Sequence, residues 1–230
     1  MAVRSIKSMK ELPSDAVILT PDEAALYQWK LIVDWKPQTE VWALRLTPGI
    51  LGALSAASGI FINSHFRGKL KLGTYGRMSS YLPIVVLPTV ASMLYHKAFV
   101  QKAIILDSDV CPICTQIRAA SFQSVLGVGY PTVLGPFAAF MFATRHYTYR
   151  LPSVTEQPKE VFALIKKMGK SLVPFLGAAL IGQSLITMFL TYKEMMQFYT
   201  MQLKLIEAEN ALENNKRYQS TDALKMLFLK

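Results

Sequence analysis

Two cysteines, Cys111 and Cys114, are the residues of this chain whose types and spacing come closest to a reactive site. They stand in the turn Cys-Pro-Ile-Cys, a spacing shared by redox-active dithiols and by half of a zinc site. A thioredoxin-type motif needs a strand–helix setting that lowers the thiol pKa, and no strand pattern surrounds this pair. Three interpretations stay open: free or structural thiols, a local disulfide, and a redox or metal role.

A closed zinc site takes four ligands, and the only three histidines of the chain lie at the ends of apolar runs, at His65, His96 and His146. Only His96 is expected on the same side as the cysteines. The sequence also holds no Gly-rich phosphate loop and no nucleophile elbow. It therefore predicts no catalytic residue, no cofactor and no metal, and we interpret the protein as a non-enzyme.

The apolar run that follows the cysteines indicates the class of protein. No residue from Ala119 to Ala143 is charged. As a helix this run would extend roughly 37 Å, more than the ~30 Å hydrocarbon core of a bilayer. Three further apolar runs occur, so the sequence predicts an all-α membrane protein with four transmembrane helices, at residues 46–66, 79–99, 119–143 and 171–192.

Two flanking segments complete the predicted organisation. Residues 1–45 contain an amphipathic helix that begins at Thr20-Pro21-Asp22-Glu23, where a hydroxyl, a proline and a carboxylate have the spacing of a capping box. This helix would lie along the membrane interface, on a partner, or on the protein's own loops. The four-helix transmembrane domain spans residues 46–192, and residues 193–230 form a polar helical tail.

The charge distribution points to a membrane and not to nucleic acid. The chain carries a net charge of +10, with 52% hydrophobic and 17% charged residues. Its basic residues fall in short loops beside apolar spans, the pattern of membrane topology and of anionic headgroup contact. The predicted basic boundary residues follow spans one and three, at Arg67, Lys69, Arg145 and Arg150.

The spans carry packing signals. Gly52 and Ala56, and likewise Ser55 and Gly59, are four residues apart, which predicts two overlapping small-residue faces for close helix approach. Prolines predict kinks because each removes a backbone hydrogen bond, and they stand at Pro83, Pro88, Pro131 and Pro174.

A small channel or transporter is an alternative function class. The four predicted spans contain no Asp or Glu, whereas ion-coupled transporters place ionisable groups in the membrane. Gln123, Tyr130 and Gln183 are the polar residues that could line a path between the spans. A redox or metal-relay protein that uses Cys111 and Cys114 is the other alternative.

Several local patterns, taken in order over roughly residues 46–195, resemble the transmembrane protein 126 family. They are Asn63-Ser64-His65-Phe66-Arg67, Leu82-Pro83, Leu87-Pro88, the loop Asp109-Val110-Cys111-Pro112-Ile113-Cys114, Gly129-Tyr130-Pro131, Leu151-Pro152, Pro174 and Gln183. The cysteine loop looks more like the A-type paralogue than the B-type. In one departure, Gly68 follows Arg67 where the family tends to have a second arginine, and the charge moves to Lys69.

The resemblance implies a protein of the mitochondrial inner membrane that assists assembly of respiratory complex I. It implies partners among the membrane-arm subunits and other assembly factors, and no catalytic activity. A scaffold of this kind would cover helix faces of a new subunit until its final neighbour arrives. The positive-inside rule then places the basic loops in the matrix, and both termini and the cysteine loop in the intermembrane space.

Overall fold

The structure is a computed structural model that describes residues 19–106, 111–149 and 157–228. All regular elements in these ranges are helices. Four of the helices are long and apolar enough to cross a membrane, at Trp42–Lys69, Arg77–Leu106, Pro112–His146 and Lys159–Leu212. The predicted class, an all-α membrane protein with four spans, is confirmed, and each observed helix contains the span predicted from the sequence.

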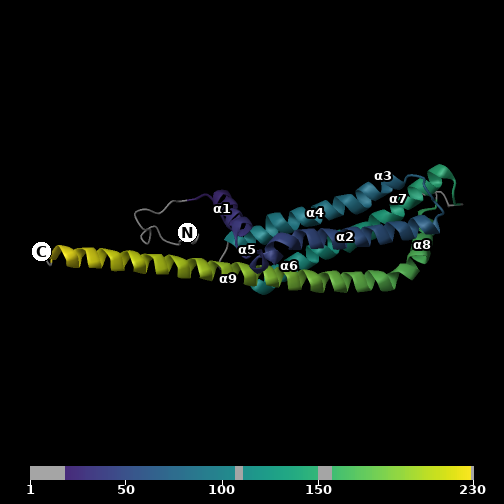
Figure 1. Cartoon of the computed structure of the whole chain (residues 1–230). Helices are drawn as coiled ribbons and strands as arrows, with labels where there is room; N and C mark the ends of the chain where they lie inside the picture. The colour runs from purple at the N-terminus through teal and green to yellow at the C-terminus, as the bar shows by residue number, and fades with distance from the viewer. Residues whose placement is uncertain (1–18, 107–110, 150–156, 229–230) are drawn as a thin grey trace.

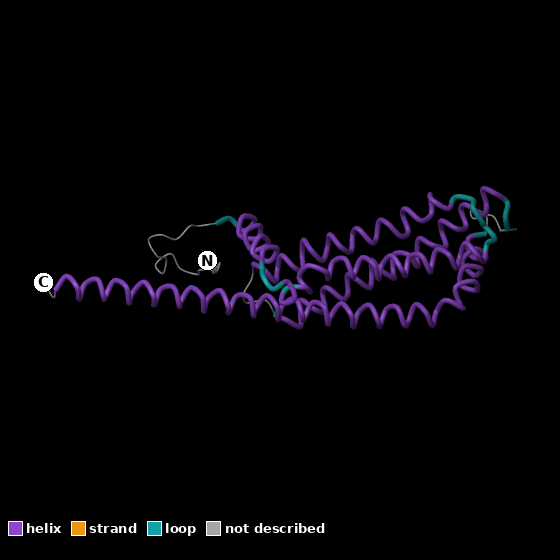
Figure 2. The backbone as a smooth tube through the Cα atoms, in the orientation of Figure 1, coloured by secondary structure: helices purple, strands orange, loops and turns teal. Residues whose placement is uncertain are grey.

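The first and fourth spans each lie in a single helix, whereas the second and third are built from several consecutive helical pieces. Figure 2 shows all four spans as helix along their length. Helix α1, Pro21–Asp34, and a short 3-10 turn, η2 (Gln38–Glu40), precede α2, Trp42–Lys69. The second span consists of α3 (Arg77–Tyr81), η3 (Leu82–Val86), α4 (Leu87–Tyr95), η4 (His96–Gln101) and α5 (Lys102–Leu106). The third consists of α6 (Pro112–Ser124), η5 (Val125–Gly129) and α7 (Tyr130–His146). The fourth follows α8 (Pro158–Gly169) and η6 (Lys170–Leu172), and belongs to α9, Val173–Phe228.

The spans form an elongated bundle with α1 and α5 at one end and α3 and α8 at the other (Figure 1). Helix α2 contacts the second, third and fourth spans, through α4, α7 and α9. Helix α9 runs along the bundle and continues past the end where α1 lies, so its C-terminal part projects away from the other helices (Figure 1). The polar tail predicted from residue 193 is thus the uninterrupted continuation of the fourth span.

Helix α1 begins with the predicted capping box and packs on the bundle. The Glu23 carboxylate accepts a hydrogen bond from the Thr20 backbone N–H at 2.9 Å, and the Glu23 N–H donates back to the Thr20 hydroxyl at 3.4 Å. This confirms the predicted helix start. Near the C-terminal end of α1, Ile32 is fully buried in an apolar cluster with residues of α2, α5 and α9, namely Leu44, Ile105 and Met201. Helix α1 therefore rests on the protein's own bundle end.

Three short stretches, η3, η4 and η5, have the wider π-helical turn. Two of them coincide with prolines: Pro83 lies inside η3, and Pro88 and Pro131 are the second residues of the helices that follow η3 and η5. A proline leaves a carbonyl of the preceding turn without its N–H partner, and a local change of winding accommodates this. Pro174 differs, because it is the second residue of α9, where a missing N–H interrupts no helical bond.

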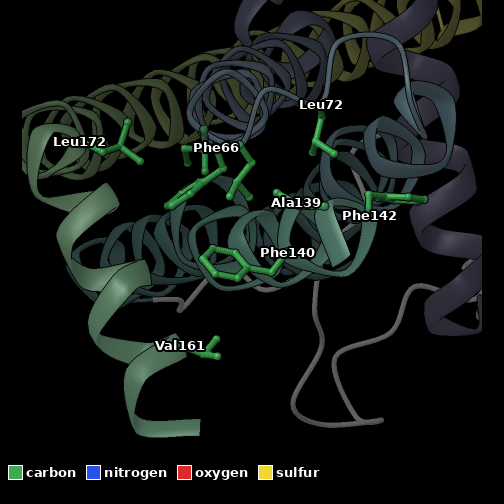
Figure 3. Packing of buried hydrophobic residues seen from close by; sticks show 10 residues of the cluster. Phe66, Leu72, Ala139, Phe140, Phe142, Val161 and Leu172 are labelled. Carbon is green, nitrogen blue, oxygen red and sulfur yellow. The ribbon is translucent and has the colours of Figure 1, made fainter. Parts of the chain in front are cut away.

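The largest apolar cluster lies at the end of the bundle where α8 crosses it (Figure 3). Phe66 of α2, Phe140 of α7 and Val161 of α8 pack there, together with Leu172 of η6. Buried apolar side chains of this kind are worth about 1.5–3 kcal/mol each against water. The cluster fixes α8 across the ends of the spans.

Candidate functional site

Five polar side chains from all four spans meet in the interior of the bundle and form what we call the central polar cluster: Ser55, Ser58, Ser92, Gln123 and Gln183. The Gln123 side-chain amide donates to Ser55 Oγ at 3.0 Å and to Gln183 Oε1 at 3.1 Å. Ser92 Oγ donates to Gln123 Oε1 at 2.5 Å, and the Gln183 amide donates to Ser58 Oγ at 2.5 Å. Every member is at least nine-tenths buried.

This cluster joins the spans to one another. Interhelical hydrogen bonds in membranes contribute on average about 0.6 kcal/mol each and up to about 1.7 kcal/mol. Space around the cluster is tight, because a Cβ atom on Gly127 would clash with Gln183 Oε1. Gln123 and Gln183, two of the residues predicted to line a channel, bind each other here; Tyr130 is half-buried at the start of α7.

A second group, the Glu194 cluster, lies toward the α1 end of the bundle and consists of His96, Gln101 and Glu194. His96 Nε2 is 2.9 Å from Glu194 Oε2, and the Gln101 amide donates to Glu194 Oε1 at 2.6 Å and to the Leu44 carbonyl at 2.8 Å. Glu194 and Gln101 are 0% exposed and His96 is 2% exposed. The cluster joins α9 to the second span and to α2.

The Glu194 cluster is not predicted from the sequence, which places Glu194 in the polar tail. In the structure this carboxylate is inside the bundle. The sequence does carry a signal, a row of polar residues at intervals of four, four and three: Gln183, Thr187, Thr191 and Glu194. The structure buries all four side chains. That spacing marks one face of a helix.

A third polar group holds the exit of the first span. Arg67, predicted as a basic boundary residue, is only 6% exposed. Its guanidinium donates to the carbonyls of Gly73 and Tyr75, both at 2.9 Å, and to Ser80 Oγ at 3.0 Å. Asn63 donates to the same hydroxyl at 3.3 Å. Arg67 therefore organises the α2–α3 loop.

The other basic boundary residues lie at the surface of the α8 end. Lys69 and Arg145 are exposed, and Arg150 lies outside the described residues. Between α8 and the start of α9 there is an open groove of about 450 Å³, lined by Ala163, Lys166, Lys167, Lys170 and Val173. The lining therefore combines two small apolar side chains with three lysines.

The small residues predicted for helix packing in the first span face the second span inside the bundle, at Gly52 and Gly59. A Cβ on Gly52 would come within 2.6 Å of the Met93 side chain, and one on Gly59 within 2.9 Å of the Ile84 carbonyl oxygen. Both neighbours belong to the second span. Ser55 bonds to Gln123, and Ala56 is half-buried between the two faces.

Cys111 and Cys114 are free thiols, and both are exposed. Cys111 is the residue that precedes α6, and Cys114 lies in the first turn of that helix. The Cys114 thiol, followed by the backbone N–H groups of Cys114 and Ile113, lowers the pKa of the Cys111 thiol. The pair thus lies at the start of a helix, and all regular elements of the described residues are helices. No group of three or more His, Cys, Asp or Glu side chains converges within the described ranges.

One further electrostatic contact joins α1 to α5. Lys102 of α5 lies 2.6 Å from Asp22, and its ammonium lowers the pKa of that carboxyl. Both side chains are largely exposed, so the pair orients the helix more than it stabilises it.

These features define a multi-pass α-helical membrane protein. The polar residues of the central polar cluster and of the Glu194 cluster form hydrogen bonds between its own helices. The profile of the family described as Transmembrane protein 126 matches residues 33–209. A Drosophila melanogaster protein named Transmembrane protein 126 is 52% identical over 213 residues, which is 92% of this chain and 96% of that protein. The chain belongs to the transmembrane protein 126 family.

A more distant relative carries a functional name. The mouse protein named complex I assembly factor TMEM126B, mitochondrial, is 29% identical over 103 residues, 45% of this chain and 44% of that protein. No solved structure matches the chain.

Proposed function

We propose that the protein is a non-enzymatic assembly factor of the mitochondrial inner membrane that aids biogenesis of the membrane arm of respiratory complex I. The observation that carries this proposal is the family membership, together with the similarity to a mouse relative named as a mitochondrial complex I assembly factor. The proposed partners are membrane-arm subunits and other assembly factors.

The distribution of buried surface supports a scaffold that binds other helices. In the most apolar stretches of the first and third spans 44% of the residues are buried, against 28% in the second span and 17% in the fourth. The fourth span therefore presents most of its apolar face outward, including Ile181, Leu185 and Phe189. Such a face can cover the helix of a newly inserted subunit until its final neighbour arrives.

Close helix approach is available on the outward faces. Gly49 of α2, and Gly177 and Gly182 of α9, have no heavy atom within 4 Å of the position a Cβ would take. In a membrane, glycine at a helix surface lets a second backbone come near, and association relies on such packing. These positions are the proposed docking points for a partner helix.

The two ends of the bundle suit different partners. The C-terminal part of α9 extends beyond the bundle beside α1 (Figure 1) and would recruit soluble factors. The opposite end carries exposed Lys69 and Arg145 and the lysine-lined groove of α8, where anionic lipid headgroups would bind. By the positive-inside rule we assign the lysine-rich end to the matrix, and the termini and cysteines to the intermembrane space.

The assembly role is tested by native electrophoresis and by deletion. The protein should co-migrate with partial complex I, and its loss should deplete the membrane arm while other respiratory complexes persist. Normal complex I after complete deletion would overturn the proposal.

The orientation is tested separately. A membrane-impermeant maleimide should label Cys111 and Cys114 in intact mitoplasts. A variant that lacks both cysteines is the control for background labelling. Labelling that requires an opened inner membrane would reverse the assigned orientation and leave the assembly role untouched.

A further inference from the structure

The two cysteines are placed where their sulfur atoms can react with each other and with an outside molecule. Cys111 is the residue before α6, and Cys114 is the third residue of that helix. The Cys114 thiol lies close enough to Cys111 to be the largest cause of the lowered pKa of the Cys111 thiol, so the two thiols are neighbours within one helical turn. Both side chains are exposed. A protein partner can therefore reach either sulfur.

The backbone holds this turn independently of the sulfur atoms. The Thr115 N–H donates to the Cys111 carbonyl at 3.2 Å, and the Thr115 hydroxyl donates to the same carbonyl at 3.2 Å. Thr115 itself is only 5% exposed. One turn further along, Ala119 is buried against residues of η4 and α9. Serine at either cysteine position should leave the helix start in place.

The two thiols are not equivalent. The Cys114 thiol and the first N–H groups of α6 lower the pKa of Cys111, and the N-terminus of a helix favours negative charge. The thiolate is the form that attacks a disulfide. Cys111 is thus the more reactive sulfur at neutral pH.

We propose that Cys111 and Cys114 form a reversible dithiol–disulfide pair that exchanges with a disulfide of a partner protein, with Cys111 as the attacking residue and Cys114 as the resolving residue. This proposal concerns an activity beyond assembly and does not depend on the assembly role.

The exchange proceeds in two balanced steps. In the first, the Cys111 thiolate attacks one sulfur of the partner disulfide, a Cys111–partner bond forms, and the partner's other sulfur leaves as a thiolate. In the second, the Cys114 thiolate attacks Cys111 Sγ, and the partner's remaining sulfur leaves with the electron pair. The two protons lost by Cys111 and Cys114 end on the two partner sulfurs. The partner gains two electrons and this chain becomes oxidised.

A purely structural disulfide is a poorer account of the pair. The bond would close a loop of only four residues, which restricts the unfolded chain far less than a long loop does. It would also stand at an exposed position on a helix whose start is already held by Thr115. Exposed disulfides of this kind are the labile ones.

The test uses the full chain in its own membranes, and trapping is its central readout. These are the only two cysteines of the sequence, so each single serine variant carries one thiol and the double variant carries none. In membranes quenched with acid and alkylated, Cys114→Ser should accumulate a mixed disulfide with a partner, seen as a heavier band that a reductant removes. Cys111→Ser should accumulate at least about fivefold less, because its remaining thiol is the resolving one.

Two further measurements distinguish the outcomes. Purified Cys114→Ser should react with 5,5′-dithiobis(2-nitrobenzoate) about fivefold faster than purified Cys111→Ser. The wild-type pair should pass between dithiol and disulfide across a series of glutathione buffers. Three results would each overturn the proposal: no adduct above the double variant, equal trapping by the two single variants, or a pair that stays in one state across all buffers.

Discussion

The two faces of α2 use the same kinds of residue for different purposes. On the inward face, Gly52 and Gly59 lie against the second span, and Ser55 bonds to Gln123. On the outward face, Gly49 and Ala53 are exposed, and a Cβ on Gly49 would meet nothing. A small residue therefore shows that close approach is possible, and only the structure shows whether the protein itself has used it.

Helix α9 repeats the contrast. Its inward face carries Gln183, Thr191 and Glu194, all buried, while Gly177 and Ile181 point outward. The buried polar residues of the inward face stabilise the fold. The apolar residues of the outward face remain available to lipid or to a partner. Substitutions on the two faces should therefore differ in their effects on stability and on partner binding.

Replacement of Glu194 with alanine should have the largest effect on stability. It removes the hydrogen-bond partner of both His96 and Gln101 in the interior, and a buried polar group left without its partner costs about 1–3 kcal/mol. The purified variant should unfold at a markedly lower temperature in mild detergent. Glu207→Ala, at an exposed position of the same helix, is the matched control and should melt with the wild type. Equal melting of both variants would show that the Glu194 cluster does not hold the bundle.

Glu194 also shows how far the sequence could predict this protein. Length and hydropathy predicted four spans, because a bilayer imposes a minimum run of apolar residues on any helix that crosses it. The same criterion ended the fourth span at residue 192, two residues before Glu194. Whether a carboxylate beyond that point meets water or a histidine of another span depends on helix packing, and His96 is far away in the sequence.

Arg67 and Cys111 illustrate the same limit at the helix ends. A basic residue after an apolar run predicts a boundary, and Arg67 does lie at one, yet its partners are loop carbonyls that only the folded loop assembles. Cysteine is not among the residues that mark helix starts, so the start of α6 at Pro112 was assigned to a connecting loop. The capping box at Thr20 was predictable because both of its partners lie within four residues.

Leucine at the inward glycines of α2 should destabilise the bundle by about 1–3 kcal/mol. The effect should be greater at Gly59, whose neighbour is the backbone oxygen of Ile84, than at Gly52, whose neighbour is the flexible Met93 side chain. Thermal melting in detergent ranks the two variants. Gly52→Leu melting below Gly59→Leu would contradict the assigned contacts with the second span.

Disruption of the central polar cluster should cost about 1–2 kcal/mol, since several interhelical hydrogen bonds are lost together. Gln123→Leu removes the side chain that bonds to Ser55, Ser92 and Gln183. Gly127→Ala should act on the same cluster by pushing Gln183 away. The control is Gly182→Ala on α9, where a new Cβ has open space. A Gly127→Ala variant as stable as Gly182→Ala would mean that the glutamines meet elsewhere.

The smallest effect on stability is expected on the outward faces, at Gly49→Leu and Gly177→Leu. No heavy atom lies within 4 Å of the Cβ position at either glycine, so the two variants should be destabilised by no more than about 0.5 kcal/mol. Both variants should nevertheless co-purify with less of the complex I membrane subunits, because leucine holds a partner helix away from the backbone. Quantitative mass spectrometry of mild-detergent purifications measures this, and variants at the inward positions serve as the opposite case. If Gly49→Leu and Gly177→Leu retained all partners, the outward faces would be ordinary lipid-facing surface, and the proposed scaffold would have to bind through its ends.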